Sequence, residues 1–203
     1  MPDASLAKLP GGLNATTHAV FGVAAFAGAS LLAGGGTPAE PPLYAYPAAV
    51  VAAWLPDVDN PRSRLGNGLS RMKNPLLNAI TRPLSWLLRT VSFVLVRAVG
   101  HRTLTHSLLG AFLFSLPVWF FLGGFPELQL ALVSGYVSHI LADALNTRGV
   151  PLLWPLGWTA RVIPGGFRSG GAVEVAVALV VMAMAGLAIY ELHPFVRATL
   201  QPL

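Results

Sequence analysis

Five apolar segments dominate the chain and limit the folds open to it. They cover residues 18–34, 44–55, 107–125, 128–142 and 175–190. A helix that crosses a bilayer needs about 20 predominantly apolar residues, so several of these segments are short and 44–55 is too short alone. Short or broken helices are tolerated where neighbouring protein satisfies the backbone. We therefore expect an all-α fold, a polytopic membrane bundle of about five transmembrane helices.

The composition agrees with a membrane location. Hydrophobic residues make up 54% of the 203 residues and charged residues only 10%, whereas soluble domains carry roughly 25% charged residues. The chain has no cysteine, so any metal must be held by His, Asp, Glu or backbone oxygen. The length suits one compact unit, and we expect residues 1–203 to form a single membrane-embedded domain.

A basic stretch separates the second and third apolar segments. Residues 60–105 contain eight Lys and Arg side chains and no Asp or Glu, and we expect 56–106 to form a basic cytoplasmic segment. Within it, 83–99 is apolar, with Arg89 and Arg97 near one face of a helix. This pattern favours a basic amphipathic helix lying in the membrane interface. A sixth, tilted span whose arginines reach back to the interface is the alternative.

The distribution of basic residues predicts the orientation. With five crossings, all but one of the 13 Lys and Arg residues fall on one side, and the exception is Arg197. The positive-inside rule places the basic side in the cytoplasm. Such charge also contacts anionic headgroups, so membrane lipids are expected partners. The net charge of +5 would suit nucleic acid, but the basic stretch carries no recognition motif, and we expect no nucleic-acid partner. The sequence carries no signature of an oligomeric state.

Seven His and Asp residues gather at the cytoplasmic ends of the apolar segments. They are His18, Asp57, Asp59, His101, His106, His139 and Asp143. His139 and Asp143 stand four residues apart, on one face of a helix. Asp57 and Asp59 repel each other unless a cation neutralises them. Each residue alone suits a helix cap or turn, but their convergence at membrane depth, where ionisable groups are costly, predicts a metal site.

Three sequence blocks carry a family resemblance. Residues 55–63 read LPDVDNPRS, residues 100–107 read GHRTLTHS, and residues 138–143 read SHILAD, followed by GVPLLWP at 149–155. In this order they resemble the YdjM-type family of LexA-regulated inner-membrane proteins, regarded as metal-dependent hydrolases. The resemblance runs from His18 to Glu174. The family is distantly similar to zinc-dependent phospholipase C and the single-strand-specific zinc nucleases, helical proteins that cleave phosphoesters at His- and Asp-bound zinc.

The resemblance implies a role for each candidate residue. The seven His and Asp residues become ligands of a divalent metal, zinc by analogy, and seven ligands leave room for two ions. Asp57 or Asp59 would orient the attacking water. Arg102 would stabilise charge on phosphate oxygens, or it would only anchor the chain to the membrane. Glu174 would be a ligand or general base, or a first-turn carboxylate favoured by the helix dipole.

The function that follows is hydrolysis of a phosphoester, a lipid or lipid-linked substrate above all, at the cytoplasmic face of a bacterial inner membrane. The alternative is a non-catalytic protein, either a metal-binding scaffold or an ion carrier. An enzyme keeps a coordination position open, whereas a structural site closes it. A carrier needs a polar path across the bilayer, and the far face lacks the polar residues to continue one.

Overall fold

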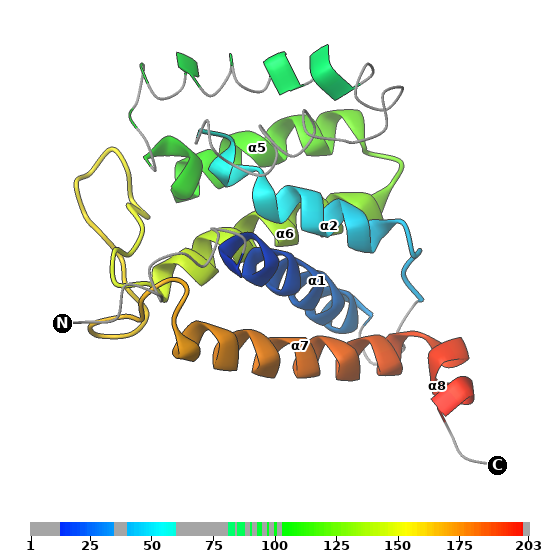
Figure 1. Ribbon diagram of the computed structural model, residues 1–203. Helices are drawn as coiled ribbons and strands as arrows, with labels where there is room; N and C mark the ends of the chain where they lie inside the picture. Colours follow the sequence, from blue (N-terminus) through cyan, green and yellow to red (C-terminus); the bar gives the residue numbers. More distant parts are fainter. Residues whose placement is uncertain are drawn as a thin grey trace.

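Helices are the only regular secondary structure in the part of the chain that the computed structural model describes. That part comprises residues 13–34, 40–59, 81–83, 85–87, 90, 93–94, 97, 100 and 103–200. Its elements are α1 (Leu13–Ala33), α2 (Ala45–Trp54), η2 (Pro56–Asp59), η4 (Leu104–His106), α5 (Leu108–Phe121), α6 (Pro126–Ala144), α7 (Ala172–Leu192) and α8 (Pro194–Leu200) (Figure 1). The expected all-α class is confirmed, since these residues form isolated β-bridges but no strand.

Each of the five apolar segments contains a helix. Two helical stretches, Ala15–Ala33 and Ala172–Leu192, are long and apolar enough to cross a membrane by length and composition. The helices α2 and α5 are apolar but shorter, with 10 and 14 residues. Most of residues 83–99 lie outside the described part, so the choice between an interfacial helix and a sixth span stays a prediction.

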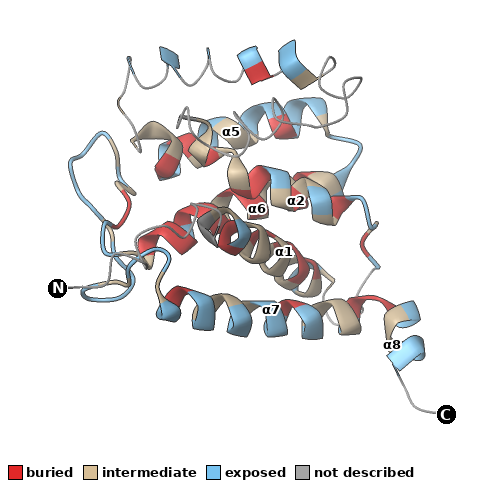
Figure 2. Ribbon diagram, in the orientation of Figure 1, coloured by how far each residue is buried: buried red, intermediate tan, exposed pale blue. Residues whose placement is uncertain are grey.

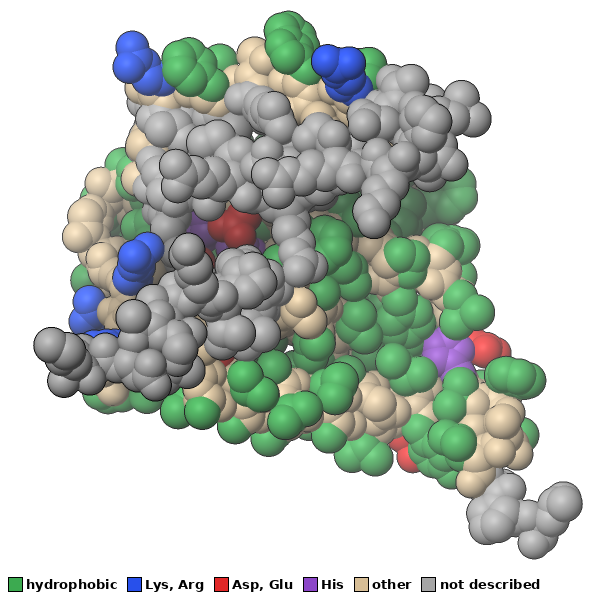
Figure 3. Space-filling model, in the orientation of Figure 1, with side chains coloured by type: hydrophobic (Ala, Val, Ile, Leu, Met, Phe, Trp, Pro, Cys, Tyr) green, Lys and Arg blue, Asp and Glu red, His purple; other side chains and the backbone are tan. Residues whose placement is uncertain are grey.

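The outer faces of α5 and α7 are apolar and exposed. On α7, Leu179, Met184 and Leu187 are each more than half exposed, and on α5 the same is true of Phe120 and Phe121. Figure 2 shows this exposure along α7, and Figure 3 shows hydrophobic side chains covering the same helix. An apolar surface of this extent marks a contact with lipid or with another protein.

The helix α2 packs closely against both α1 and α6 because small residues line the contacts. Ala49 and Ala53 of α2 are fully buried. A Cβ added to Gly22 of α1 would lie 2.9 Å from the Ala49 oxygen and from the Ala53 Cβ, and one added to Gly135 of α6 would overlap the Ala49 backbone. Small residues allow such close backbone approach. The last turn of α2 therefore lies against the C-terminal half of α6.

The start of α5 is fixed by three local contacts. Ser107 is the N-cap, and its hydroxyl accepts a hydrogen bond from the Gly110 N–H at 3.1 Å. A Cβ on Gly110 would overlap the Leu104 carbonyl, so the turn before the helix folds tightly onto it. Tyr136 of α6 donates its hydroxyl to the Thr105 carbonyl at 2.8 Å. These contacts hold η4, with the histidine at its end, against α6.

Replacing Gly135 with alanine tests the close packing of α2 on α6. The added methyl group overlaps the Ala49 backbone, and overpacking of this kind typically lowers the free energy of unfolding by about 1–3 kcal/mol. The measurement is unfolding of the purified protein in detergent by titration with SDS. Gly28→Ala is the matched control, because a Cβ there meets nothing within 4 Å. Equal stability of the two variants would contradict the packing.

Candidate metal centre

The helix α6 supplies two adjacent donors to a buried cluster. His139 and Asp143 are 0% and 3% exposed, and they lie one turn apart with His139 Nε2 3.7 Å from Asp143 Oδ2. The predicted placement of both side chains on one helical face is confirmed. Their position follows from the contact of α6 with α2, which encloses this part of α6 between neighbouring helices.

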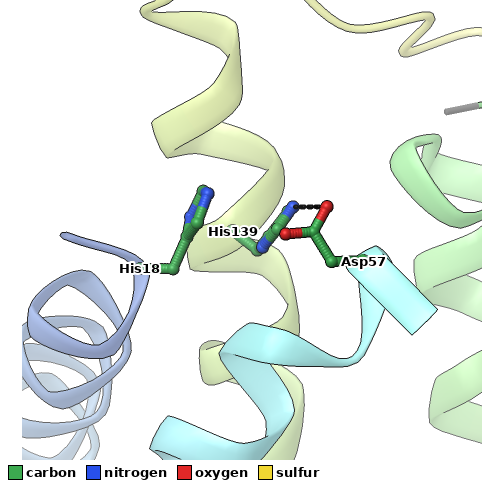
Figure 4. A group of neighbouring side chains, drawn as sticks. All are labelled: His18, Asp57 and His139. Atoms are coloured by element: carbon green, nitrogen blue, oxygen red, sulfur yellow. Dashed lines mark ion pairs between the residues drawn. The ribbon is translucent and has the colours of Figure 1, made fainter. Parts of the chain in front are cut away.

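Three other elements bring further donors to His139. Asp57 lies in η2, directly after α2, His106 ends η4, and His18 lies in the second turn of α1. Figure 4 shows His18 and Asp57 approaching His139 from opposite sides, from α1 and η2. The rings of His18 and His139 stack with centroids 3.8 Å apart. Residues far apart in sequence thus converge at one end of the bundle, as their chain positions predicted.

The donor atoms of His106, His139 and Asp143 are close enough to one another to bind one ion. His106 Nε2 lies 3.2 Å from His139 Nε2 and 3.5 Å from Asp143 Oδ2. Asp57 Oδ1 lies 3.8 Å and 3.9 Å from the two Nε2 atoms. Tetrahedral zinc with bonds of 2.0–2.2 Å places its ligand atoms about 3.3–3.6 Å apart. The nitrogen–oxygen separations of 3.5 Å or more are also too long for hydrogen bonds, so the arrangement fits ligands around a cation.

A backbone hydrogen bond orients His139 for metal binding. Its Nδ1 lies 2.7 Å from the Ala53 carbonyl oxygen, and because a carbonyl only accepts, Nδ1 must carry the proton. In the neutral ring Nε2 then presents a lone pair to the cluster. A carbonyl partner of this kind typically fixes metal-binding imidazoles. His106 has a comparable partner, since its Nδ1 lies 2.9 Å from the Thr105 hydroxyl.

The carboxylate of Asp143 faces two groups of donors. Its Oδ2 faces His106 and His139, whereas its Oδ1 lies 3.6 Å from His18 Nε2. Oδ1 also accepts a hydrogen bond from the Asn146 amide at 3.3 Å. His18 is 6% exposed, and its Nδ1 is buried without a hydrogen-bond partner among the described residues. Such a nitrogen costs about 1–3 kcal/mol unless a ligand satisfies it.

Two overlapping groups of side chains can hold a metal in the described part of the chain. One is His106, His139 and Asp143, and the other is His18, Asp57 and His139. Both need His139 Nε2, because Nδ1 bonds to the Ala53 carbonyl, and one nitrogen serves one ion at a time. Two ions are therefore compatible with the geometry only if a carboxylate, such as that of Asp143, lies between them. The donor chemistry fits a divalent cation in either case.

Glu174 lies beside the cluster but in neither of these groups. It is 3% exposed, and it accepts hydrogen bonds from the Thr17 hydroxyl at 2.7 Å and from the Gly170 N–H at 2.6 Å. These contacts join the start of α7 to α1, one residue before His18. They match a first-turn carboxylate at the helix N-terminus. A role for Glu174 as ligand or base stays a prediction.

Three predicted site residues cannot be placed. His101, Arg102 and the side chain of Asp59 lie outside the described residues. Conversely, the structure adds two groups that the sequence did not single out: the Ala53 carbonyl, which orients His139, and Asn146, which orients Asp143. Asn146 has a sequence signal, since it follows Asp143 by three residues at the helix end. A backbone carbonyl has none.

Comparison with known proteins identifies the family. Residues 13–197 match the YdjM inner membrane protein family. The chain belongs to this family. It is 38% identical to the inner membrane protein YdjM of Escherichia coli, and equally to that of Shigella flexneri, over 122 residues, 57% of this chain and 52% of either relative. The match thus spans about half the length of these relatives.

A relative named as the uncharacterized protein YvsG of Bacillus subtilis is 30% identical over 146 residues, 70% of this chain and 74% of the relative. No solved structure matches the chain. The YdjM-family membership confirms the resemblance that the three sequence blocks carry. It agrees with the apolar outer faces of α5 and α7, since the family is one of inner membrane proteins.

Metal binding by this YdjM-family chain is testable with Co²⁺, whose visible spectrum reports coordination geometry. We expect tetrahedral absorption bands, lost in His106→Ala and Asp143→Asn. Loss of either ligand should weaken binding at least about 100-fold, beyond the 10–100-fold typical of outer-shell changes. His193→Gln is the matched control, because His193 is also buried but bonds to Glu40 and Tyr46. Equal binding by all three variants would refute the centre.

Proposed function

We propose that this protein is a membrane-bound, metal-dependent hydrolase that cleaves a phosphoester at the cytoplasmic membrane face. The observation that carries the proposal is the spacing of three donor atoms, His106 Nε2, His139 Nε2 and Asp143 Oδ2, which lie 3.2–3.7 Å from one another. They come from η4 and one turn of α6, and Asp57 of η2 lies beside them. Buried, paired ionisable groups inside an apolar bundle indicate function rather than stability. Membership of an inner membrane family supports the location.

The cluster is open on one side, which favours catalysis over a closed structural site. The side chains of His106, His139 and Asp143 are at most 5% exposed, whereas that of Asp57 is 34% exposed. Catalytic metal sites keep a position for water or substrate, and structural sites do not. The face beside Asp57 is where we place the substrate phosphate.

The division of roles follows from these positions. A divalent ion held here by Asp143 and the histidines would supply Lewis acidity for the activation of water. Asp57, the exposed carboxylate, accepts the proton of the water whose oxygen attacks phosphorus, and this proton then passes to the alkoxide that leaves as the P–O bond breaks. Arg102, which follows His101 and precedes His106 by four residues in the sequence, would stabilise the phosphate oxygens. Asp143 and the histidines hold the ion.

A basic surface beside the cluster favours an anionic substrate, lipid or lipid-linked. The connection from α6 to α7 begins next to Asp143, contains no acidic residue, and exposes Arg148, Arg161 and Arg168. The same connection exposes Leu156 and Trp158 at 70% and 55%. Tryptophan and arginine side by side are typical of the membrane interface, where they contact headgroups. A phosphate at the lipid surface would meet these side chains first.

We further propose five crossings, with the metal centre in the cytoplasm. The order of elements supports this arrangement, because α1, α5 and α7 begin at the metal end whereas α2 and α6 end there. Since the native chain has no cysteine, single introduced cysteines report the topology. In intact spheroplasts an impermeant maleimide should label Glu127→Cys and not Arg161→Cys, until the membrane is opened. Labelling of both positions in intact spheroplasts would place them on the same side of the membrane. That result would contradict a single crossing between them.

The activity itself is tested with the full chain in detergent–phospholipid micelles. We expect release of phosphate or of a phosphorylated headgroup from an anionic phospholipid such as phosphatidate. His106→Ala and Asp143→Asn should lower the rate at least about 100-fold, because both hold the ion. His193→Gln should retain the rate, since it lies at the other end of the bundle.

The metal content of the same preparations separates the alternatives. Bound metal without turnover of lipid or soluble phosphoesters would favour a non-catalytic scaffold. A wild-type protein that takes up no metal on reconstitution would contradict both the enzyme and the scaffold. Turnover that survives chelation and both ligand substitutions would place the activity elsewhere.

A further inference from the structure

A second candidate site lies at the end of the bundle opposite the metal centre. A pocket of about 420 Å³ opens there between the end of α1, the end of α5 and the start of α6. Its apolar wall includes Trp119, Leu130 and Val133, and its polar lining includes Glu40, Glu127 and Gln129. Pockets of roughly 300–1,000 Å³ with apolar walls and a few placed polar groups are the usual form of small-molecule sites.

A buried hydrogen-bond chain orients one of the two carboxylates. Glu40 Oε1 accepts from His193 Nδ1 at 2.9 Å, and His193 Nε2 lies 2.8 Å from the Tyr46 hydroxyl. A carboxylate only accepts, so Nδ1 carries a proton and Nε2 of the neutral ring accepts from Tyr46. His193 is 2% exposed. His193 is the only described histidine outside the metal centre, and it fixes Glu40 at the edge of the pocket.

The mouth of the pocket, at the end of the bundle opposite the metal centre, is negatively charged. The described residues of the lining include two glutamates and neither Lys nor Arg. Arg197 is the only Lys or Arg beyond residue 168, and its guanidinium is paired with Glu191 at 2.8 Å. The pocket glutamates therefore lack a basic partner within the described lining. Gln129 adds an amide whose nitrogen lies 3.5 Å from the Trp119 carbonyl oxygen.

We propose that this pocket binds an amphipathic organic cation, with its charged group at Glu40 and Glu127 and its apolar body against Trp119, Leu130 and Val133. A positive group satisfies the two carboxylates, and the indole face of Trp119 attracts cations as well. The rest of the ligand must be apolar, because the remaining pocket wall offers few hydrogen-bonding groups. The site is independent of the proposed hydrolase activity, since it shares no residue with the metal centre.

The probe is tetraphenylphosphonium, measured by equilibrium dialysis against the full chain in phosphatidylcholine nanodiscs, with empty nanodiscs as background. Tetraphenylborate has the same shape and the opposite charge, so we expect saturable binding of the phosphonium and none of the borate. Glu127→Gln and Glu40→Gln should each weaken binding at least about fivefold, the size of one partly exposed charge pair. Glutamine at position 40 can still accept from His193.

Glu191→Gln is the matched control, because it removes a carboxylate from the same end but outside the pocket, and its affinity should stay within about twofold of the wild type. His106→Ala should also bind the phosphonium normally, which separates failure of this site from failure of the metal centre. Equal binding of the phosphonium and the borate would overturn the proposal, and so would unchanged phosphonium binding in both pocket variants. The pocket would then be an apolar crevice for acyl chains.

The natural ligand's cationic group has two possible sources, the ammonium group of a soluble amine and that of an ethanolamine headgroup. Nanodiscs containing phosphatidylethanolamine distinguish the two sources of this one chemistry. A rise in the apparent Kd for the phosphonium with ethanolamine lipid content would assign the pocket to the headgroup. An unchanged Kd would assign it to a soluble amphipathic amine.

Discussion

The hydrogen bond from His139 Nδ1 to the Ala53 carbonyl, 2.7 Å long, is the contact on which the site depends. It forms because α2 and α6 meet closely at Ala49 and Gly135, where a Cβ added to Gly135 would overlap the Ala49 backbone. Carbonyls in the last turn of a helix lack an intrahelical partner, so that of Ala53 is free to accept. This single bond decides the tautomer of His139 and aims its other nitrogen at the neighbouring donors.

The buried charge around His139 explains why so many elements are needed. Asp143 is 3% exposed and His106 is 0% exposed, in a bundle whose outer surface is apolar. A carboxylate in such surroundings is costly unless it is paired and hydrogen-bonded. Asn146 and three histidines surround Asp143, and a divalent cation among them would balance the remaining charge. The order of the helices along the chain brings these charged and polar groups together at one end of the bundle. It therefore determines the electrostatics of the site.

The two ends of the bundle differ in chemistry, and the alternating direction of the helices produces the difference. The metal end carries exposed arginines in the α6–α7 connection, which suit phosphate and anionic lipid. The far end carries glutamates around an apolar pocket. A chain that crosses a membrane keeps such groups apart, because ionisable side chains are expensive between the two interfaces. Two ligand chemistries can thus occupy one small bundle without interference.

The sequence by itself determined the helical class, the apolar segments and most of the candidate metal donors, because hydropathy and the spacing of His139 and Asp143 are local properties. The positions of His18, Asp57 and His106 at the ends of apolar segments also predicted that these residues are neighbours, which the structure confirms. Only the tertiary structure decided that Asp143 faces two sets of donors and that Ala53 orients His139, since both depend on helix packing. It also showed that His193 orients Glu40 through a hydrogen bond. These two residues are 153 positions apart in the sequence, so they come into contact only when the bundle has folded.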